Sequence, residues 1–533
     1  MMNRKNLFYI IIDALRWDVL QNYDSAKAIM PNIAELMQGG FTRKTIANSQ
    51  STQFVMPSLF SLTYPLDHGG YNTGIRNRPK SYVEVVKEAG YSTNLISTCN
   101  QLGVHFGYDR GFDRLATTNT FATLIEQLIN RVLYYNIELL QKNQTTQAET
   151  IEIVQREFDK MLERLQEQFT KWDKSFWPEK LLKWNKKIYD ASFKEREILH
   201  QNPQIILKKL REISPGIYWR YLGKTHAPAL SFFFARTIES CRWRSRRFLQ
   251  HINWIPFLFL SHFQVLLQDL SPKLKKFIHD APQPWLIHMH IMDVHDCRSL
   301  NRIFWRLKIL KYFPRIWRAH QKGLTKRRFL YDLTLAAVDH ELGRIINSMK
   351  ENGTFDKTIF LVTGDHGLQY AHSPRPRSEI AYRTHYEDIN VPLVIANSDK
   401  IPAKSANNLD SMGVTATLLE AAGLLLHPSF KGVSAYAGGR EIIISESAGG
   451  GNADLAHRDL YFTVTSLTHK LMATLRGNRL LIEEFYNLDV DPYELNNIAK
   501  SSSRNPALTD LMSHLLKERS ELFRARNISL EKV

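Results

Sequence analysis

Two apolar runs that are far apart in the sequence each end in residues able to bind a cation. LVTGDHG at 361–367 breaks from apolar residues into Asp365 and His366, and LFYIIID at 7–13 ends in Asp13. Short apolar runs of this kind predict buried strands. Open α/β sheets place their sites at the carboxyl ends of strands, where a carboxylate and an imidazole offer half of a metal site. The two runs can share one site only if both strands belong to one sheet.

Eight sequence blocks, taken together, resemble the sulfatase family, which belongs to the alkaline phosphatase superfamily. In family order they read FYIIIDALRWD at 8–18, MPNIAELMQGGF at 30–41, PSLFSLTYPLDHGG at 57–70, EVVKEAGYST at 84–93, GYDRGFD at 107–113, TGDHG at 363–367, HYEDINVPLVI at 385–395 and FYNLDVDPYELNNIA at 485–499. The resemblance covers about residues 1–120 and 284–500. It implies an alkaline-phosphatase-like α/β fold with a three-layer αβα core and a central, mostly parallel sheet.

The resemblance also implies a nucleophile and shows where this chain departs from the family. Counting back from Ser61 by the family's interval gives Thr52 as the nucleophile, where sulfatases carry a Cys or Ser within C/S-x-P-x-R. This chain reads TQFVM there, without the proline and the arginine, and threonine cannot become the formylglycine aldehyde. Relatives that transfer phosphoryl groups do use a threonine. Two alternatives remain open, namely that Thr52 only caps the following helix and that Ser51 is the nucleophile.

The same comparison gives the metal ligands. Asp13, Thr52, Asp365 and His366 are expected to bind a divalent cation, which lowers the pKa of a coordinated hydroxyl and makes it a better nucleophile. Sulfatases have a second aspartate after the first and an asparagine after the third, whereas this chain has Ala14 and His366. The loss of one oxygen ligand and the gain of an imidazole favour zinc or manganese over calcium.

A second group of candidates surrounds the run PWLIHMHIMDVHD at 284–296. Asp293, His295 and His385 resemble the second-metal set of two-metal phosphodiesterases, in which two cations hold the attacking and leaving oxygens. One-ion and two-ion sites both remain open. His295 and His385 are also expected to stabilise the oxygens of the ester as catalytic residues.

Three further residues are candidates for contact with the substrate. His290 is either a ligand or a core histidine, and His372 competes with His385 for the third place in the second-metal set. Lys470 falls where sulfatases often place a basic strand that contacts the substrate. His288, which lies deeper in its strand than His290, is expected to be structural.

Length and composition predict several structural units. With 533 residues, the chain exceeds what one core usually supports. We expect catalytic core at 1–120 and 284–440, a basic helical insertion at 121–283 and a small α+β subdomain at 441–533. Three scattered cysteines do not suggest disulfides, and no signal peptide precedes the first apolar run. These features favour a cytoplasmic protein, with peripheral attachment to a membrane as an alternative.

The net charge of +17 is concentrated in two segments. Residues 121–280 contain 26 Lys or Arg against 17 Asp or Glu, and residues 301–328 contain ten against none. The second segment interleaves its cations with aromatic residues, which fits an anionic membrane surface or a polyanionic substrate such as a glycan or a lipid-linked ester. A solvated basic face is the alternative. No known nucleic-acid motif accompanies the charge, so no nucleic acid is expected.

The sequence therefore predicts a metal-dependent hydrolase or transferase that acts on phosphate or sulfate esters, with Thr52 as the nucleophile. A true sulfatase is the second possibility, favoured by the block pattern and opposed by the missing C/S-x-P-x-R motif. A non-catalytic relative that binds anionic glycans or membranes is the third, and the retained metal residues oppose it.

Overall fold

A computed structural model gives the fold of the chain. The structure describes residues 4–99, 102–117, 121, 135–204, 233, 234, 237, 241, 244, 265–295, 309–319, 326–368, 384–403, 405–449, 455, 456, 458–502 and 504–528.

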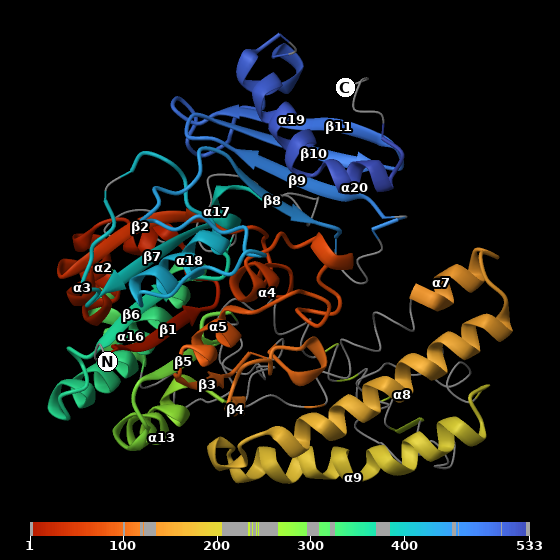
Figure 1. Cartoon of the computed structure of the whole chain (residues 1–533), viewed down its shortest axis with the longest axis horizontal. Helices are drawn as coiled ribbons and strands as arrows, with labels where there is room; N and C mark the ends of the chain where they lie inside the picture. Colours follow the sequence, from red (N-terminus) through yellow and green to blue (C-terminus); the bar gives the residue numbers. More distant parts are fainter. Residues whose placement is uncertain are drawn as a thin grey trace.

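In this described part, seven strands form a central sheet in the order β2-β7-β6-β1-β5-β3-β4 (Figure 1). β7 is antiparallel to β6 and β2, and the other neighbouring pairs are parallel. The strands are β1 (Asn6–Ile12), β2 (Gly40–Ile46), β3 (Ser92–Ser97), β4 (Arg114–Thr117), β5 (Trp285–Ile291), β6 (Thr358–Thr363) and β7 (Asn390–Ala396). The sheet is therefore mixed but mostly parallel.

The register of the sheet brings distant sequence segments to one edge. β1 lies between β5 and β6, and Ile11 pairs with His290 on one side and with Thr363 on the other. Because all three strands are parallel, they end at the same edge of the sheet. Asp13 and Asp365, which follow β1 and β6, therefore emerge side by side although they are about 350 residues apart.

Both faces of the sheet are covered by helices, because successive residues of a buried strand point to opposite faces. Leu7, Tyr9 and Ile11 pack into one core with α4, α5 and α18. Phe8, Ile10 and Ile12 pack into the other with α3, α13 and α16. These three layers agree with the predicted αβα core.

The helices and 3-10 turns have the following bounds: α1 (Trp17–Leu20), α2 (Tyr23–Ile29), α3 (Pro31–Gln38), α4 (Thr52–Ser61), η1 (Asp67–Gly69), α5 (Tyr82–Glu88), η2 (Val104–Phe106), α7 (Tyr135–Gln141), α8 (Gln147–Lys171), η4 (Lys174–Phe176), α9 (Glu179–Gln201), α13 (Leu267–Asp280), η5 (Leu310–Tyr312), α15 (Phe313–Ala319), α16 (Lys326–Glu351), α17 (Tyr386–Ile389), α18 (Ser411–Ala421), η6 (Ala499–Ser501), α19 (Pro506–Glu518) and α20 (Ser520–Ala525).

A second, antiparallel sheet lies above the core in Figure 1, beside α19 and α20. Its strands are β8 (Ile443–Ser447), β9 (Leu460–Thr465), β10 (His469–Arg476) and β11 (Arg479–Asn487). An ion pair ties this part to the core, since the Asp67 carboxylate lies 2.6 Å from Arg519, which stands between α19 and α20. Lys431, which precedes β8, lies 2.8 Å from the same carboxylate. The second sheet and its two helices form the α+β part of the fold.

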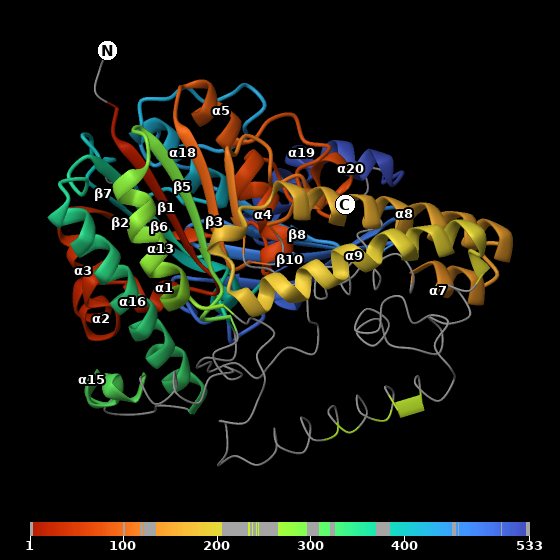
Figure 2. The same ribbon diagram turned by 90° about the horizontal axis from the view of Figure 1, so that it is seen from below.

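The described part of the predicted insertion is helical. α8 and α9 lie alongside each other and extend from the core (Figure 2). α8 begins with a capping box, in which Thr146 and Glu149 bond to each other's backbone amides. Among the described residues, no helix is long and apolar enough to cross a bilayer.

Candidate metal centre and nucleophile

Asp13, Asp365 and His366 converge at the carboxyl edge of the central sheet. All three are buried, and one possible ligand atom from each lies within 4.8 Å of the others. Two carboxylates and one imidazole at this spacing could hold a metal ion. The structure thus brings together the two halves predicted from strands β1 and β6.

A left-handed turn after β1 holds two of these side chains in place. Ala14 has φ 59° and is fully buried, a conformation that costs a non-glycine residue about 1–2 kcal/mol. The turn lets the Ala14 amide donate to Asp365 Oδ1 at 3.0 Å, and the His366 amide donates to the same oxygen at 2.8 Å. Asp365 Oδ1 therefore fixes the turn, and Oδ2 remains available to bind a cation.

The ring of His366 is oriented by its own neighbour. Nδ1 donates to the Gly367 carbonyl at 2.7 Å, so a neutral ring carries its lone pair on Nε2. Burial alone would lower the pKa of His366, but the carboxylates of Asp365 and Asp13 outweigh it and hold the pKa above its usual value. Gly367 permits this arrangement because a Cβ there would lie 1.9 Å from the Glu387 carbonyl oxygen.

Thr52 is the first residue of α4 and its hydroxyl faces the ligand group. Thr52 Oγ1 donates to Asp13 Oδ2 at 2.8 Å and lies 3.3 Å from His366 Nε2. Ser51 occupies the N-cap position, where its side chain makes no capping hydrogen bond. The Thr52 side chain is therefore directed at the two candidate ligands.

Several buried polar atoms around this group need a partner. Among the described residues, Asp13 Oδ1, Asp365 Oδ2 and both ring nitrogens of His290 have no hydrogen-bond partner. His290 Nε2 lies 3.7 Å from Asp13 Oδ2 and 3.9 Å from Asp365 Oδ2. Buried polar atoms are almost always satisfied, so unpaired carboxylate oxygens beside an imidazole fit a cation site.

The Asp13 carboxyl is held in its ionised form. Burial alone would raise its pKa, but the nearby rings of His295, His290 and His366 outweigh that effect and lower the pKa below its usual range. An ionised carboxylate is the form that binds a cation.

Two further buried side chains, Tyr331 and Arg16, hold the Ala14 turn in place, and the sequence did not predict this role for them. The Tyr331 hydroxyl donates to the Ala14 carbonyl at 2.8 Å and accepts from the Arg16 amide at 3.0 Å. The Arg16 guanidinium bonds the Leu368 carbonyl at 2.8 Å, just after the GDHG loop. The only signal available in the sequence was Arg16, which lies inside the first family block; Tyr331 sits in an ordinary helical pattern.

Of the two candidate residues that follow β5, Asp293 is buried and His295 is exposed. Asp293 is buried, and both of its carboxylate oxygens accept from the Leu267 amide at 3.1 Å at the start of α13. Burial raises the pKa of Asp293 to about 7. His295 is exposed, yet it is close enough to Asp13 to lower the pKa of that carboxyl. His288 Nδ1 forms a 2.6 Å hydrogen bond with the Tyr82 hydroxyl in the core, as expected of a structural residue.

His385 and Lys470 each contact an acidic partner. His385 Nε2 lies 3.0 Å from Glu484, and the buried Lys470 ammonium lies 2.7 Å from Glu494. Asp293, His295 and His385 do not form a ligand cluster among the described residues. His372 lies outside the described residues.

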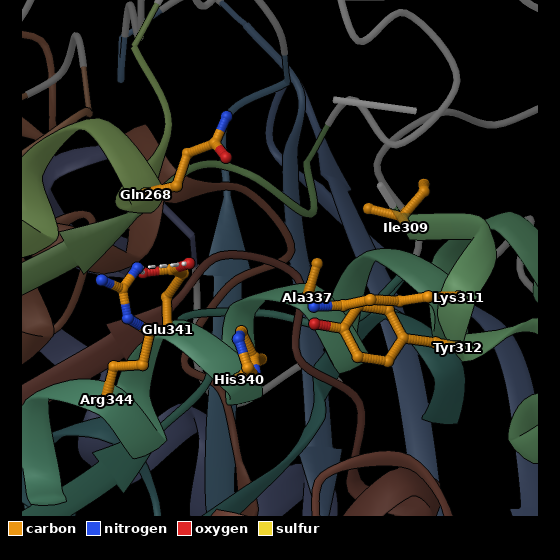
Figure 3. Close-up of a pocket in the computed structure, with 8 residues that line it drawn as sticks. All are labelled: Gln268, Ile309, Lys311, Tyr312, Ala337, His340, Glu341 and Arg344. Atoms are coloured by element: carbon orange, nitrogen blue, oxygen red, sulfur yellow. Dashed lines mark hydrogen bonds and ion pairs between the residues drawn. The ribbon is translucent and has the colours of Figure 1, made fainter. Parts of the chain in front are cut away.

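The structure contains a separate cavity of about 420 Å³ between α13, η5 and α16 (Figure 3). Its polar lining consists of Gln268, Lys311, Tyr312, His340, Glu341 and Arg344, and none of the candidate ligands contributes to it. Arg344 pairs with Glu341 at 3.1 Å. The cavity therefore belongs to another part of the surface than the metal group.

Comparison with solved structures identifies the fold. The chain superposes on a 2-O GAG sulfatase with a TM-score of 0.54 at 12% identity, covering 98% of this chain and 96% of the other. It superposes on the phosphonate monoester hydrolase of Agrobacterium radiobacter with a TM-score of 0.56 at 15% identity, covering 97% and 96%. The predicted alkaline-phosphatase-like α/β fold is confirmed.

Sequence comparison places the chain in a family. An arylsulfatase of Clostridium perfringens is 25% identical over 211 residues, 37% of this chain and 41% of that protein. An N-acetylglucosamine-6-sulfatase of Bos taurus is 25% identical over 218 residues, 34% of this chain and 38% of that protein. The matched part thus spans about two-fifths of each relative. The Sulfatase family itself matches residues 5–424, most of the chain. Together with the shared fold, this match shows that the chain belongs to the sulfatase family.

Proposed function

We propose that this chain is a metal-dependent hydrolase or transferase of sulfate or phosphate esters in which Thr52 is the nucleophile. One observation carries the proposal: the Thr52 hydroxyl donates to Asp13 Oδ2 at 2.8 Å within a buried Asp13, Asp365 and His366 group. A hydroxyl aimed at a ligand group from the N-terminus of a helix is the arrangement expected of an activated nucleophile.

Asp13, Asp365 and His366 would hold the cation, with Thr52 beside them. The unpaired oxygens of Asp13 and Asp365 and the Nε2 lone pair of His366 are suitable donors. This mixed oxygen and nitrogen set favours zinc or manganese over calcium. When bound, such a cation would favour the deprotonated hydroxyl and withdraw charge from the ester.

The residues of the chain account for the rest of the reaction. Thr52 Oγ1 forms a bond to sulfur or phosphorus and gives up its proton to solvent, while Asp13 Oδ2, which accepts its hydrogen bond, orients the hydroxyl. The ester bond to the leaving alcohol breaks, and His295 donates a proton to that oxygen. Water, or an acceptor hydroxyl in a transferase, then displaces the group from Thr52.

The arrangement favours a single ion. Both carboxylate oxygens of Asp293 accept from the start of α13, and His385 is bonded to Glu484. Asp293, His295 and His385 do not converge on a second site among the described residues. His290, which lies beside both carboxylates, is the better candidate for contact with an ester oxygen or for a further ligand.

Sulfuric ester hydrolysis is the second candidate, and family membership favours it. Thr52 in place of a residue that can become an aldehyde favours phosphoryl transfer instead. Sulfated glycans and lipid-linked esters both remain candidate substrates, and the 2-O GAG sulfatase among the structural neighbours is in line with the first of these.

The experiment combines metal analysis with a set of substrates. The purified chain is analysed for metal and then assayed on an aryl sulfate, an aryl phosphate monoester and an aryl phosphodiester. Thr52→Ala is compared with Ser51→Ala, a matched control that removes the neighbouring hydroxyl. We expect Thr52→Ala to lose turnover by about three orders of magnitude or more while it keeps its metal.

Ser51→Ala should retain both metal and turnover, because the Ser51 side chain makes no capping bond. Loss of activity in Ser51→Ala with full activity in Thr52→Ala would instead identify Ser51 as the nucleophile. A wild-type protein that binds metal and turns over none of the three esters would support the non-catalytic alternative.

A further inference from the structure

The segment formed by η5 and α15 has three distinct faces. Ile309 and Ile316 are buried against the protein, and Tyr312 is half-buried beside them. A second set consists of apolar residues that point outward, namely Leu310, Phe313, Pro314 and Trp317. The third is a row of cations, Lys311, Arg315 and Arg318. Each set follows the spacing of a helical face.

The outward apolar face is open to water. Leu310 and Phe313 are each 40% exposed and Trp317 is 60% exposed. Phe313 and Trp317 stack on each other with ring centroids 5.6 Å apart, and Phe329 of α16 supports Phe313 edge-on at 5.1 Å. A helix that is apolar on two faces is normally buried on both. The face of Leu310, Phe313 and Trp317 is instead exposed to water, with its rings packed on one another, and this indicates a binding surface.

The charge of this surface indicates the partner. Residues 309–319 contain three cations and no acidic residue, and the longer segment 301–328 contains ten cations and no acid. Arg315 is partly fixed by a 3.1 Å bond to the Ile29 carbonyl in α2, whereas Lys311 and Arg318 are exposed. A rigid aromatic face beside exposed cations is complementary to a surface that is anionic outside and apolar beneath.

The neighbouring cavity does not explain the surface. Lys311 and Tyr312 contribute to its wall, but Arg344 is already paired with Glu341. Phe313 and Trp317 do not line the cavity. A small anionic ligand in it would leave the aromatic face in water.

We propose that α15 docks the protein onto an anionic lipid bilayer, with Phe313 and Trp317 in the headgroup layer and Lys311 and Arg318 against lipid phosphates or carboxylates. A sulfated polymer would be held mainly by the cations, because a hydrated chain removes less of the apolar surface of Leu310, Phe313 and Trp317 from water than a bilayer does. The binding of an interfacial helix to a bilayer grows with its buried apolar area and with its attraction to anionic lipids, and α15 offers both.

The position of α15 relates docking to the candidate site. α15 packs against α2 and the start of α16, and Arg328 of α16 pairs with Asp18 at 2.5 Å, five residues after Asp13. Figure 2 shows α15 on the side of the molecule toward which β1 and β5 run. Docking through α15 would turn the carboxyl edge of the sheet toward the membrane.

Co-sedimentation of the full chain with vesicles tests the proposal. The probes are mixed vesicles of phosphatidylcholine and phosphatidylserine, and vesicles of phosphatidylcholine alone. The apolar arm is Phe313→Ser with Trp317→Ser, matched by Leu425→Ser, an exposed apolar residue elsewhere (90% exposed). The basic arm is Lys311→Glu with Arg318→Glu, matched by Arg479→Glu with Lys500→Glu, which are also exposed.

We expect wild type to bind the mixed vesicles and not to bind the vesicles of phosphatidylcholine alone. Each arm should weaken binding by about tenfold or more, and the two control variants should bind as wild type. Circular dichroism and turnover of a small aryl ester, both unchanged in the variants, would show that folding is intact.

Three results would overturn the proposal. The first is equal binding of the mixed vesicles by wild type and by the variants of both arms. The second is loss of binding in the basic arm with full binding in the apolar arm. The third is tight binding of heparin that depends on the cations while the mixed vesicles are ignored, which would identify a soluble polyanion as the partner.

Discussion

Tyr331 is expected to set the metal affinity of a site that it does not contact. Its hydroxyl donates to the Ala14 carbonyl at 2.8 Å and accepts from the Arg16 amide at 3.0 Å, on either side of the left-handed turn that follows Asp13. Tyr331→Phe keeps the ring and removes both hydrogen bonds.

The magnitude follows from burial. Ala14 is fully buried and Arg16 is 4% exposed, so a carbonyl and an amide would each lose a partner at about 1–3 kcal/mol. The free energy of unfolding should therefore fall by about 2–6 kcal/mol. The same bonds hold Ala14 in an unfavourable conformation, so the Asp13 carboxylate should shift, and metal affinity should fall by about tenfold to a hundredfold, as for other outer partners of ligands.

Tyr71→Phe is a matched control. Tyr71 is also fully buried, and its hydroxyl likewise donates to a carbonyl, that of Gly449 at 2.7 Å, and accepts from an amide, that of Ala448 at 3.2 Å. The Tyr71 ring stacks on Phe54 of α4, so the comparison is made on metal affinity rather than on turnover.

The assay is competition for zinc or manganese with a chelating dye, carried out well below the unfolding temperature of both variants. Both should lose stability, and only Tyr331→Phe should lose metal affinity. Equal metal affinity in the two variants, at similar losses of stability, would refute the reasoning and reduce Tyr331 to an ordinary core residue.

Three further predictions concern the ligand loop and the link to the second sheet. Asp365→Asn should keep the amide bonds that fix the Ala14 turn but lose metal and turnover together; metal analysis of a folded variant checks this, and full metal content would exclude Asp365 as a ligand. Gly367→Ala should displace the loop because a Cβ has no room there, whereas Gly39→Ala, with nothing within 4 Å, should leave activity unchanged; equal activity of the two would contradict the packing argument. Asp67→Asn should destabilise the protein by about 2 kcal/mol at neutral pH. Burial alone would raise the pKa of Asp67, but Arg519 and Lys431 outweigh it and bring the pKa down to about 2. A depressed pKa gives stability that is present above the usual value near 3.8 and is lost as pH falls toward 2. Thermal melts of the variant and wild type should therefore converge in that interval, and a constant difference would contradict the ion-pair origin.

The sequence was sufficient to predict the parts of the site that follow strands. An apolar run followed by a carboxylate places that residue at a sheet edge, which is why Asp13, Asp365 and His366 could be paired across about 350 residues. Thr52 could be placed only through the family interval. Each of these predictions depends on local pattern or on spacing within a block.

The partners of side chains could not be predicted in the same way, because they depend on packing between distant elements. Asp293 follows β5 as Asp13 follows β1, yet its carboxylate accepts from the start of α13. Lys470 is paired with Glu494, which has a positive φ of 58° in a turn near the C-terminus. Tyr331 shows no pattern that distinguishes its hydroxyl from that of any core tyrosine.

The role of Thr52 can be measured by trapping the group that it receives. Enzyme mixed with an aryl ester that has a good leaving group is quenched in acid within one turnover, and the peptide containing Thr52 is analysed by mass spectrometry. The proposed mechanism predicts one sulfuryl or phosphoryl group on Thr52, absent in Thr52→Ala. The same group on Ser51, or turnover by Thr52→Ala equal to wild type, would contradict it.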